Sequence, residues 1–378
     1  MSGARLCCGL WVGQVSMRGV APSMFRRICV CAIGLILLGS CTDQAKAPSS
    51  VQQPAVSAPP EEVPHLSLVS SSVGTLTLTW SALNGATSYF WWQVSPTPSK
   101  PLEVTNTQVT LPDLFPGRLY TFAVVGANAA GWGPVSPLAS VMMPADWNGV
   151  AAQAAPFAYR VKFGSCYQAG CAMPIAVGYT LSLPATGGQR KCGASGPPPD
   201  TTARWTLLPC WSQQSSLFFV TAYHIFCNTS NSVPEFLNAR GSVVYWSNSG
   251  CTGHYAGPVS RDIAGQFTTR GTGGLTRAAA GPLQNDQVLV FGTTPSGQPS
   301  PQSATILATG VDFQEPLSPG FSGTTVHGAI ALGGSLGEAL PGSPVLNGRG
   351  EVLGAFVPPG SGTHSIGGVP VSGYILLW

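Results

Sequence analysis

The sequence predicts an all-β protein with two folded domains. Its 378 residues suit two or three domains of ordinary size. It holds 47 glycines and 34 prolines, and both residue types interrupt helices. Short apolar segments, many of them alternating with polar residues, are separated by turn residues, while the apolar spacing of helices is almost absent. We therefore expect one β domain of about 80 residues and a larger β domain, a barrel or sandwich, after it.

Residues 1–40 predict an export signal. Arg26 and Arg27 precede an apolar run over residues 28–39, and small residues follow it. The run is too short for the roughly 20 residues that span a bilayer, although an uncleaved membrane anchor is the alternative. The signal is complete from Met24, which we take as the functional start. Its end, Leu-Gly-Ser-Cys, resembles a bacterial lipobox, which implies that Cys41 carries lipid and becomes the mature N-terminus.

Charge and cysteine content fit an exported protein. Charged residues make up 8% of the chain, against about 25% in an average protein. The chain lacks the Lys and Arg clusters that neutralise phosphates, which excludes nucleic-acid binding. Loss of the signal removes four arginines and no acid, so the formal net charge changes from +3 to −1. Six cysteines then remain beside Cys41, an even number typical of disulfides: Cys166, Cys171, Cys192, Cys210, Cys227 and Cys251. Their connectivity stays open, and we expect no metal and no cofactor, because no second ligand pair has zinc spacing.

The composition of residues 41–63 indicates a tether, and the strand pattern of residues 64–144 indicates a β-sandwich. The tether is rich in Ala, Pro, Ser and Gln without apolar periodicity. After it, alternating segments around residues 66–69, 76–80, 89–94, 109–111 and 119–124 have the period of two of half-buried strands.

Several spaced features of this segment are similar to a fibronectin type III domain. They are Trp80 in an early strand, the Leu114, Pro116, Gly117 and Tyr120 corner, and the turn from Asn128 through Gly131-Trp132-Gly133-Pro134. The resemblance implies that Trp80 fills the core and that the Tyr120 hydroxyl bonds to backbone at the corner. Such a domain binds a ligand or serves as a spacer that packs only its own core. We favour the spacer, because no charged or aromatic motif stands out.

Residues 150–378 contain three stretches of chemical interest. An apolar strand from Leu217 leads into Thr-Ala-Tyr and then His224. Asp286 stands at the start of an apolar strand, and Gly342-Ser343-Pro344-Val345 opens a hairpin. The histidine, the acid and Ser343 are separated by 62 and 57 residues.

This order resembles the chymotrypsin-like serine proteases, and most closely the branch that includes lysyl endopeptidases. The resemblance implies a double β-barrel with His224 as general base and Asp286 as the carboxylate that orients its imidazole. It also implies that Cys227 and Cys251 form a disulfide at the histidine loop.

The resemblance fails at the nucleophile. In the family register the nucleophile position falls on Pro341, which has no hydroxyl and no N–H for an oxyanion hole. Two serines remain as alternatives. Ser343 requires a rebuilt loop, whereas Ser335 lies between glycines and requires an insertion of six residues before the hairpin.

The sequence therefore predicts a lipoprotein of the cell envelope whose protease-like domain binds a protein or peptide without cleaving it. Thr42 is not the Asp that resembles an inner-membrane retention signal, so we expect the outer membrane, facing the periplasm or the cell surface, with contact to the membrane through the lipid. The alternatives are an active serine endopeptidase that uses Ser335 or Ser343, and a surface adhesion protein.

Overall fold

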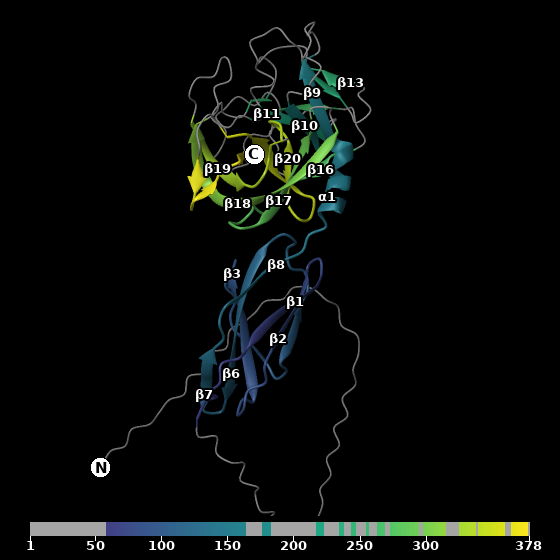
Figure 1. Ribbon diagram of the computed structural model, residues 1–378. Helices are drawn as coiled ribbons and strands as arrows, with labels where there is room; N and C mark the ends of the chain where they lie inside the picture. The colour runs from purple at the N-terminus through teal and green to yellow at the C-terminus, as the bar shows by residue number, and fades with distance from the viewer. Residues whose placement is uncertain are drawn as a thin grey trace, which may run out of the picture. The chain divides into compact units, whose positions relative to one another are not determined.

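Two groups of mostly antiparallel strands make up the described chain, which confirms the all-β prediction (Figure 1). The computed structural model describes residues 58–163, 176–182, 217–222, 234–237, 243–246, 255–256, 263–268, 273–294, 298–314, 325–337, 339–359 and 364–376. The predicted signal, Cys41 and most of the tether lie outside these residues, as do His224 and the six candidate disulfide cysteines. Within the described ranges, no helix has the length and apolar character needed to cross a membrane.

The first group of strands forms two sheets. One contains β1 (Leu66–Ser72), β2 (Thr75–Trp80) and β5 (Gln108–Leu111) in the order β1-β2-β5. The other has the order β4-β3-β6-β7, with β8 also paired to β6; its strands are β3 (Ser88–Ser95), β4 (Leu102–Val104), β6 (Leu119–Asn128), β7 (Gly131–Val135) and β8 (Ala139–Met142).

The core of this sandwich forms because alternate residues of each strand point to the same side. In β2 the buried positions are Leu76, Leu78 and Trp80, and they pack against Phe122 of β6. Trp80 is 5% exposed, so it fills the core as expected. The backbone N–H of Phe115 donates to the Tyr120 hydroxyl at 2.9 Å, which confirms the predicted corner.

A short helix leads from the sandwich to the second group of strands. Helix α1 (Trp147–Ala154) begins where the Asp146 carboxylate accepts a hydrogen bond from the backbone N–H of Gly149 at 2.9 Å, an N-cap. A 3₁₀ turn, η1 (Ala155–Phe157), follows directly. Val150 and Ala154 of the helix are buried against the second group.

The next sheet contains eight strands in the order β13-β12-β9-β10-β11-β15-β14, with β16 paired to β10. They are β9 (Ala158–Phe163), β10 (Ala176–Ser182), β11 (Leu217–Ala222), β12 (Pro234–Leu237), β13 (Val243–Trp246), β14 (Tyr255–Ala256), β15 (Ile263–Thr268) and β16 (Leu275–Thr276).

A closed barrel follows along the chain, in the order β17-β18-β19-β24-β21-β20. Its strands are β17 (Gln287–Thr293), β18 (Pro299–Gln314), β19 (Thr325–Gly333), β20 (Pro344–Leu346), β21 (Val352–Val357) and β24 (Gly373–Leu376). A small hairpin of β22 (Ser365–Ile366) and β23 (Val369–Pro370) precedes the last strand.

Strands β17, β20, β21 and β24 of the barrel are buried on both faces, which explains their continuous apolar runs. In β17, Val288 and Val290 belong to one apolar cluster together with Ile330 of β19, while Leu289 and Phe291 belong to another. The second cluster includes Tyr179 and Leu181 of β10 and Leu275 of β16. One face of β17 therefore packs with other barrel strands, and the other face contributes to a junction with the preceding sheet.

Candidate functional site

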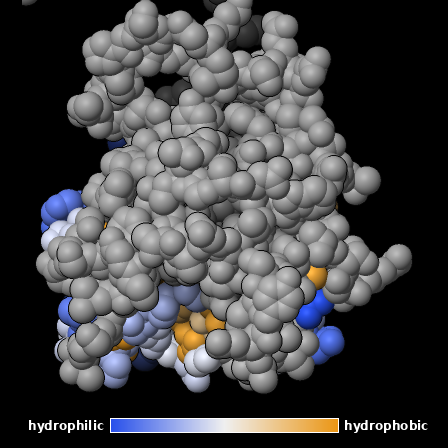
Figure 2. All heavy atoms as spheres, turned by 90° about the horizontal axis from the view of Figure 1, so that it is seen from above, coloured by the Kyte–Doolittle hydropathy of each residue, from blue (hydrophilic) through white to orange (hydrophobic). Residues whose placement is uncertain are grey.

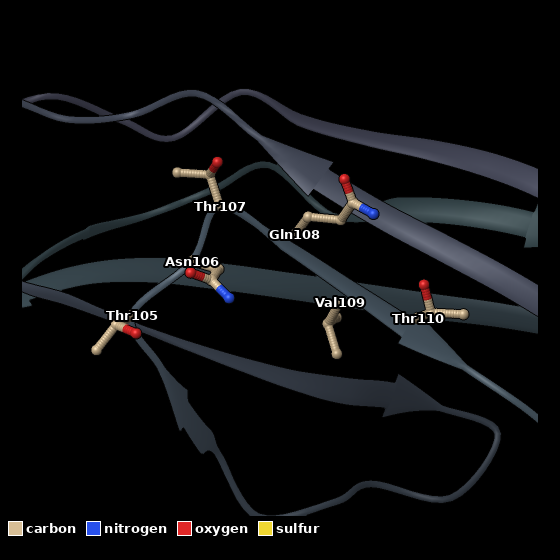
Figure 3. A pocket seen from close by; sticks show the side chains of 6 residues that line it. All are labelled: Thr105, Asn106, Thr107, Gln108, Val109 and Thr110. Carbon is tan, nitrogen blue, oxygen red and sulfur yellow. The ribbon is translucent and has the colours of Figure 1, made fainter.

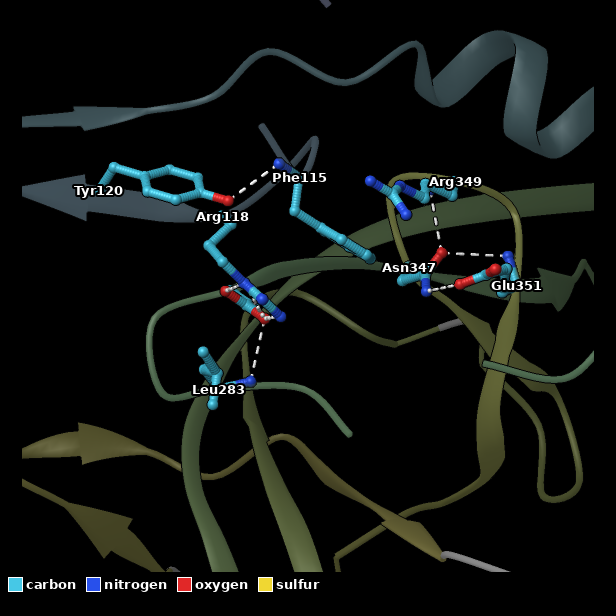
Figure 4. A network of polar contacts seen from close by, with 8 residues as sticks. Phe115, Arg118, Tyr120, Leu283, Asn347, Arg349 and Glu351 are labelled. Carbon is cyan, nitrogen blue, oxygen red and sulfur yellow. Dashed lines mark hydrogen bonds and ion pairs between the residues drawn. The ribbon is translucent and has the colours of Figure 1, made fainter. Parts of the chain in front are cut away.

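Asp286, predicted as the triad carboxylate, lies at the start of β17 and is buried. Its oxygens accept three hydrogen bonds from the Arg118 guanidinium, at 3.0 and 3.2 Å from Nε and at 2.8 Å from Nη2 (Figure 4). The backbone N–H of Leu283 adds a fourth at 2.9 Å. Both carboxylate oxygens thus have partners without His224, which lies outside the described residues, so the pairing of Asp286 with His224 stays a prediction.

The register of β17 separates Asp286 from the hairpin that holds Pro341 and Ser343. Val290 of β17 pairs with Val345 of β20, so two further steps along each antiparallel strand bring Ser343 level with residue 292. Asp286 is six residue steps from that level, which is about 20 Å at roughly 3.3 Å per residue. The structure does not bring Asp286 and Ser343 together.

Ser343 is fully buried, and its hydroxyl already has a partner. Its relative exposure is 0%, and its Oγ donates to the Leu340 carbonyl at 2.7 Å. The Ser343 N–H donates to the same carbonyl at 3.1 Å, and the Ser343 carbonyl accepts from Phe356 N at 2.8 Å. A nucleophile must be reachable by substrate, so this geometry argues against Ser343 in that role.

Two further N–H groups near Pro341 also donate within the protein. Ala339 donates to the Leu336 carbonyl at 3.1 Å, and Gly342 donates to the Phe356 carbonyl at 2.8 Å. Gly342 has a φ of +82°, a conformation that favours glycine and turns the chain into β20. Together with the missing N–H of Pro341, these bonds leave the described turn without the paired free donors that an oxyanion hole needs.

The Pro341 carbonyl connects this loop to the eight-stranded sheet by a hydrogen bond. It accepts a hydrogen bond from Val177 N of β10 at 3.0 Å. Val177 lies two residues before Tyr179, which pairs with Val220 of β11. Because β10 and β11 are antiparallel, Val177 is level with the end of β11 at Ala222. In the sequence, His224 follows two residues later.

A second acid, Asp262, is an alternative partner for His224 that the sequence analysis did not name. It directly precedes β15 in the sequence, and the first residue of β15, Ile263, pairs with Ala222. The register therefore brings the start of β15 to the end of β11 from which the His224 segment continues. Neither Asp262 nor His224 belongs to the described residues. In the sequence, Asp262 precedes only the short apolar segment Ile-Ala. Asp286 precedes a longer apolar run, which is the stronger sign of a strand.

Ser335, the other candidate nucleophile, is exposed in the turn after β19. Gly333 of β19 pairs with Thr305 of β18, which pairs with Gln287 of β17. The turn therefore leaves the barrel at the level of Asp286, which is the end of β17 away from Ser343.

Burial is the main cause of the pKa shifts at the junction between the eight-stranded sheet and the barrel. Burial raises the pKa of Tyr179 well above its usual value, although the nearby Arg277 guanidinium opposes this. Burial also lowers the pKa of Arg277 to about 10, and the interaction with Tyr179 raises it slightly in return. Arg277 thus stays a cation at neutral pH beside a neutral tyrosine.

The described surface offers no metal site. Among the described residues, no three His, Cys, Asp or Glu side chains lie close enough to hold an ion.

A polar hollow of about 590 Å³ on the sandwich is lined by the consecutive residues 105–110 and carries no titratable side chain (Figure 3). Trp132 on β7 is 50% exposed, and its ring contacts the ring of Phe90. On the face shown in Figure 2, the described residues mix hydrophilic and apolar types.

The comparisons with known proteins fall into two groups. The family model "Fibronectin type III domain" matches residues 58–141. The solved structure "FN3tt mut" is 27% identical, covers 22% of this chain and 97% of its own, and has a TM-score of 0.21. No curated protein matches the chain.

The second group consists of proteases. The Rv3671c protease of M. tuberculosis in its inactive form is 14% identical over 61% of this chain and 87% of its own, with a TM-score of 0.37. The MamO protease domain from Magnetospirillum magneticum is 14% identical over 59% and 93%, also with a TM-score of 0.37. Of the double barrel that the sequence predicts, the described residues show one closed barrel, preceded by an eight-stranded sheet. Residues 58–141 thus match the fibronectin type III model, and the chain is also similar to these two protease structures.

Proposed function

We propose that this protein is a lipid-anchored envelope protein whose trypsin-like domain binds a protein or peptide and does not cleave it. The observation that carries the proposal is Pro341 at the nucleophile position. Proline offers neither the hydroxyl that attacks a peptide bond nor an N–H that stabilises the oxyanion. The nearest serine along the hairpin, Ser343, is buried and donates to the Leu340 carbonyl.

The strand register supports a binding role at the junction of the eight-stranded sheet and the closed barrel. The Pro341 carbonyl bonds to Val177 of β10, and Ala222, which precedes the His224 segment, is level with Val177. In a trypsin-like fold this is where a nucleophile and its base would meet a peptide. Loss of the nucleophile removes the chemistry and leaves the peptide-facing surfaces in place, so binding is the activity that remains.

The test is labelling of the purified full-length protein with a serine-directed fluorophosphonate. We expect no labelling, while an active trypsin-like protease in a parallel sample is labelled. Labelling that disappears in the His224→Ala variant would overturn the proposal. Binding is then measured with a peptide library at equal concentrations of wild type and His224→Ala, and recovery of intact peptides is the expected result.

An active endopeptidase that uses Ser335 is the second candidate. The specific observation in its favour is that Ser335 is exposed next to Gly334, whose φ is +139°. This candidate requires that Ser335→Ala and His224→Ala each abolish peptide hydrolysis. If neither substitution changes turnover, the hydrolysis belongs to a contaminant and this candidate is rejected.

Anchoring through Cys41 has its own test. Cells grown with radiolabelled palmitate should incorporate label into the protein, and Cys41→Ala should lose the label and move the protein to the soluble fraction. Label retained by Cys41→Ala would contradict the lipobox assignment.

A further inference from the structure

The corner loop of the fibronectin domain, residues 115–118, contacts the closed barrel through an ion pair. Arg118 of this loop and Asp286 of the barrel are 168 residues apart in the sequence and 2.8 Å apart at their closest atoms. Their side chains are 15% and 7% exposed. A bidentate Arg–carboxylate pair that is this buried is stronger and more directional than a surface pair.

A ring between two guanidinium groups extends the contact. The Phe115 ring centroid lies 4.6 Å from Cζ of Arg118 and 4.5 Å from Cζ of Arg349, which belongs to the β20–β21 turn. These are cation–π distances. The turn is held in shape by Asn347, whose side-chain oxygen accepts from Arg349 N at 2.9 Å and from Glu351 N at 3.0 Å (Figure 4).

Two glycines allow the backbones of the two domains to touch. The Gly117 carbonyl accepts a hydrogen bond from Gln287 N of β17 at 2.6 Å. Gly117 has a φ of +76°, and a Cβ there would lie 3.0 Å from the Gln287 carbonyl oxygen. A Cβ on Gly348 would lie 2.3 Å from the Pro116 carbonyl oxygen. Any larger residue at position 348 would have to push the loop and the turn apart.

Little empty space remains at this contact. The cavity lined by residues of the loop, β17 and the β20–β21 turn has a volume of about 10 Å³, at the lower limit for holding a water molecule. The covalent connection is also short, because Met143 is buried in the sandwich core and α1, which begins at Trp147, packs on the barrel. Residues 55–378 cluster as one compact unit.

We propose that loop 115–118 is a built-in docking site that joins the fibronectin domain and the closed barrel into one rigid, cooperatively unfolding body. The fibronectin domain then does more than space the barrel from the membrane. It holds the start of β17 and the turn after β20, while the Pro341 hairpin lies at the far end of β17, about 20 Å away by strand register. The proposal does not depend on whether the barrel cleaves or only binds.

The experiment is differential scanning calorimetry of the full-length protein. Wild type should unfold in one transition. Arg118→Ala leaves a buried carboxylate without its cation, so we expect the midpoint to fall by about 10 °C or the transition to split in two. Asp286→Ala should act similarly, and the double variant should lose less than the sum of the two single losses. The matched control is Asp312→Ala, which breaks a solvent-exposed pair with His327 between two strands of the barrel. This variant should keep a single transition within about 2 °C of wild type.

Two independent transitions in wild type, both unchanged by Arg118→Ala, would overturn the proposal. Hydrogen exchange covers the case in which Arg118→Ala fails to fold. The Gln287 amide should be protected in wild type and should exchange at least tenfold faster in Gly348→Ala, which keeps the ion-pair residues but forces the loop away. Equal exchange in Gly348→Ala and wild type would also contradict the proposal.

Discussion

Ser343→Ala separates a structural serine from a catalytic one. The hydroxyl donates to the Leu340 carbonyl at 2.7 Å in a site with 0% exposure. A buried hydrogen bond of this kind contributes about 0.5–1.5 kcal/mol net. The Leu340 carbonyl keeps the bond from Ser343 N at 3.1 Å, so it does not become unsatisfied. We therefore expect a loss of about 1 kcal/mol in the free energy of unfolding.

In a domain of 150–250 residues this loss lowers the melting temperature by about 2–4 °C. The assay is thermal unfolding followed by circular dichroism, with fluorophosphonate labelling and peptide hydrolysis measured on the same samples. Ser343→Thr is the matched control: it keeps the hydroxyl but adds a methyl group to a filled site, and we expect a loss of about 1–3 kcal/mol. The reasoning is refuted if Ser343→Ala leaves the melting temperature unchanged and abolishes labelling or hydrolysis, because that pattern belongs to an exposed nucleophile.

A further prediction concerns an exposed titrating pair. The pKa of Asp312 is lowered chiefly by its hydrogen bond with His327, so the carboxylate contributes stability above its ordinary pKa of about 4 and loses it as the pH falls through the lowered value; His327→Ala should raise the Asp312 pKa in a carbon-13 NMR titration, and an unchanged pKa would contradict the assignment.

The sandwich could be predicted closely because its signals are local. Trp80 belongs to a strand whose alternation is visible in six residues, and the Tyr120 hydroxyl reaches Phe115 only five residues away. The spacer interpretation did not anticipate the contacts of the corner loop. Arg118 and Asp286 meet only through tertiary structure, and nothing in the spacing of 168 residues indicates a pair.

The barrel was predicted as a fold more securely than as a site. Asp286 was correctly placed at the start of an apolar strand, β17. Strand pairing decides which sheet each of these strands joins. Strand β17 pairs with β18 and β20 in the closed barrel, whereas β11, which leads to His224, pairs with β10 and β15 in the eight-stranded sheet. Strand pairing over such separations has no local sequence signal, so order along the chain alone could not choose between Asp262 and Asp286.

The hydrogen bonds around Pro341 limit what a serine at this position could do. Pro341→Ser would supply one hydroxyl and one N–H. The N–H groups of Ala339 and Ser343 would remain bonded to the Leu336 and Leu340 carbonyls. Under the proposed function, Pro341→Ser alone would therefore add a hydroxyl without a free pair of donors for the oxyanion.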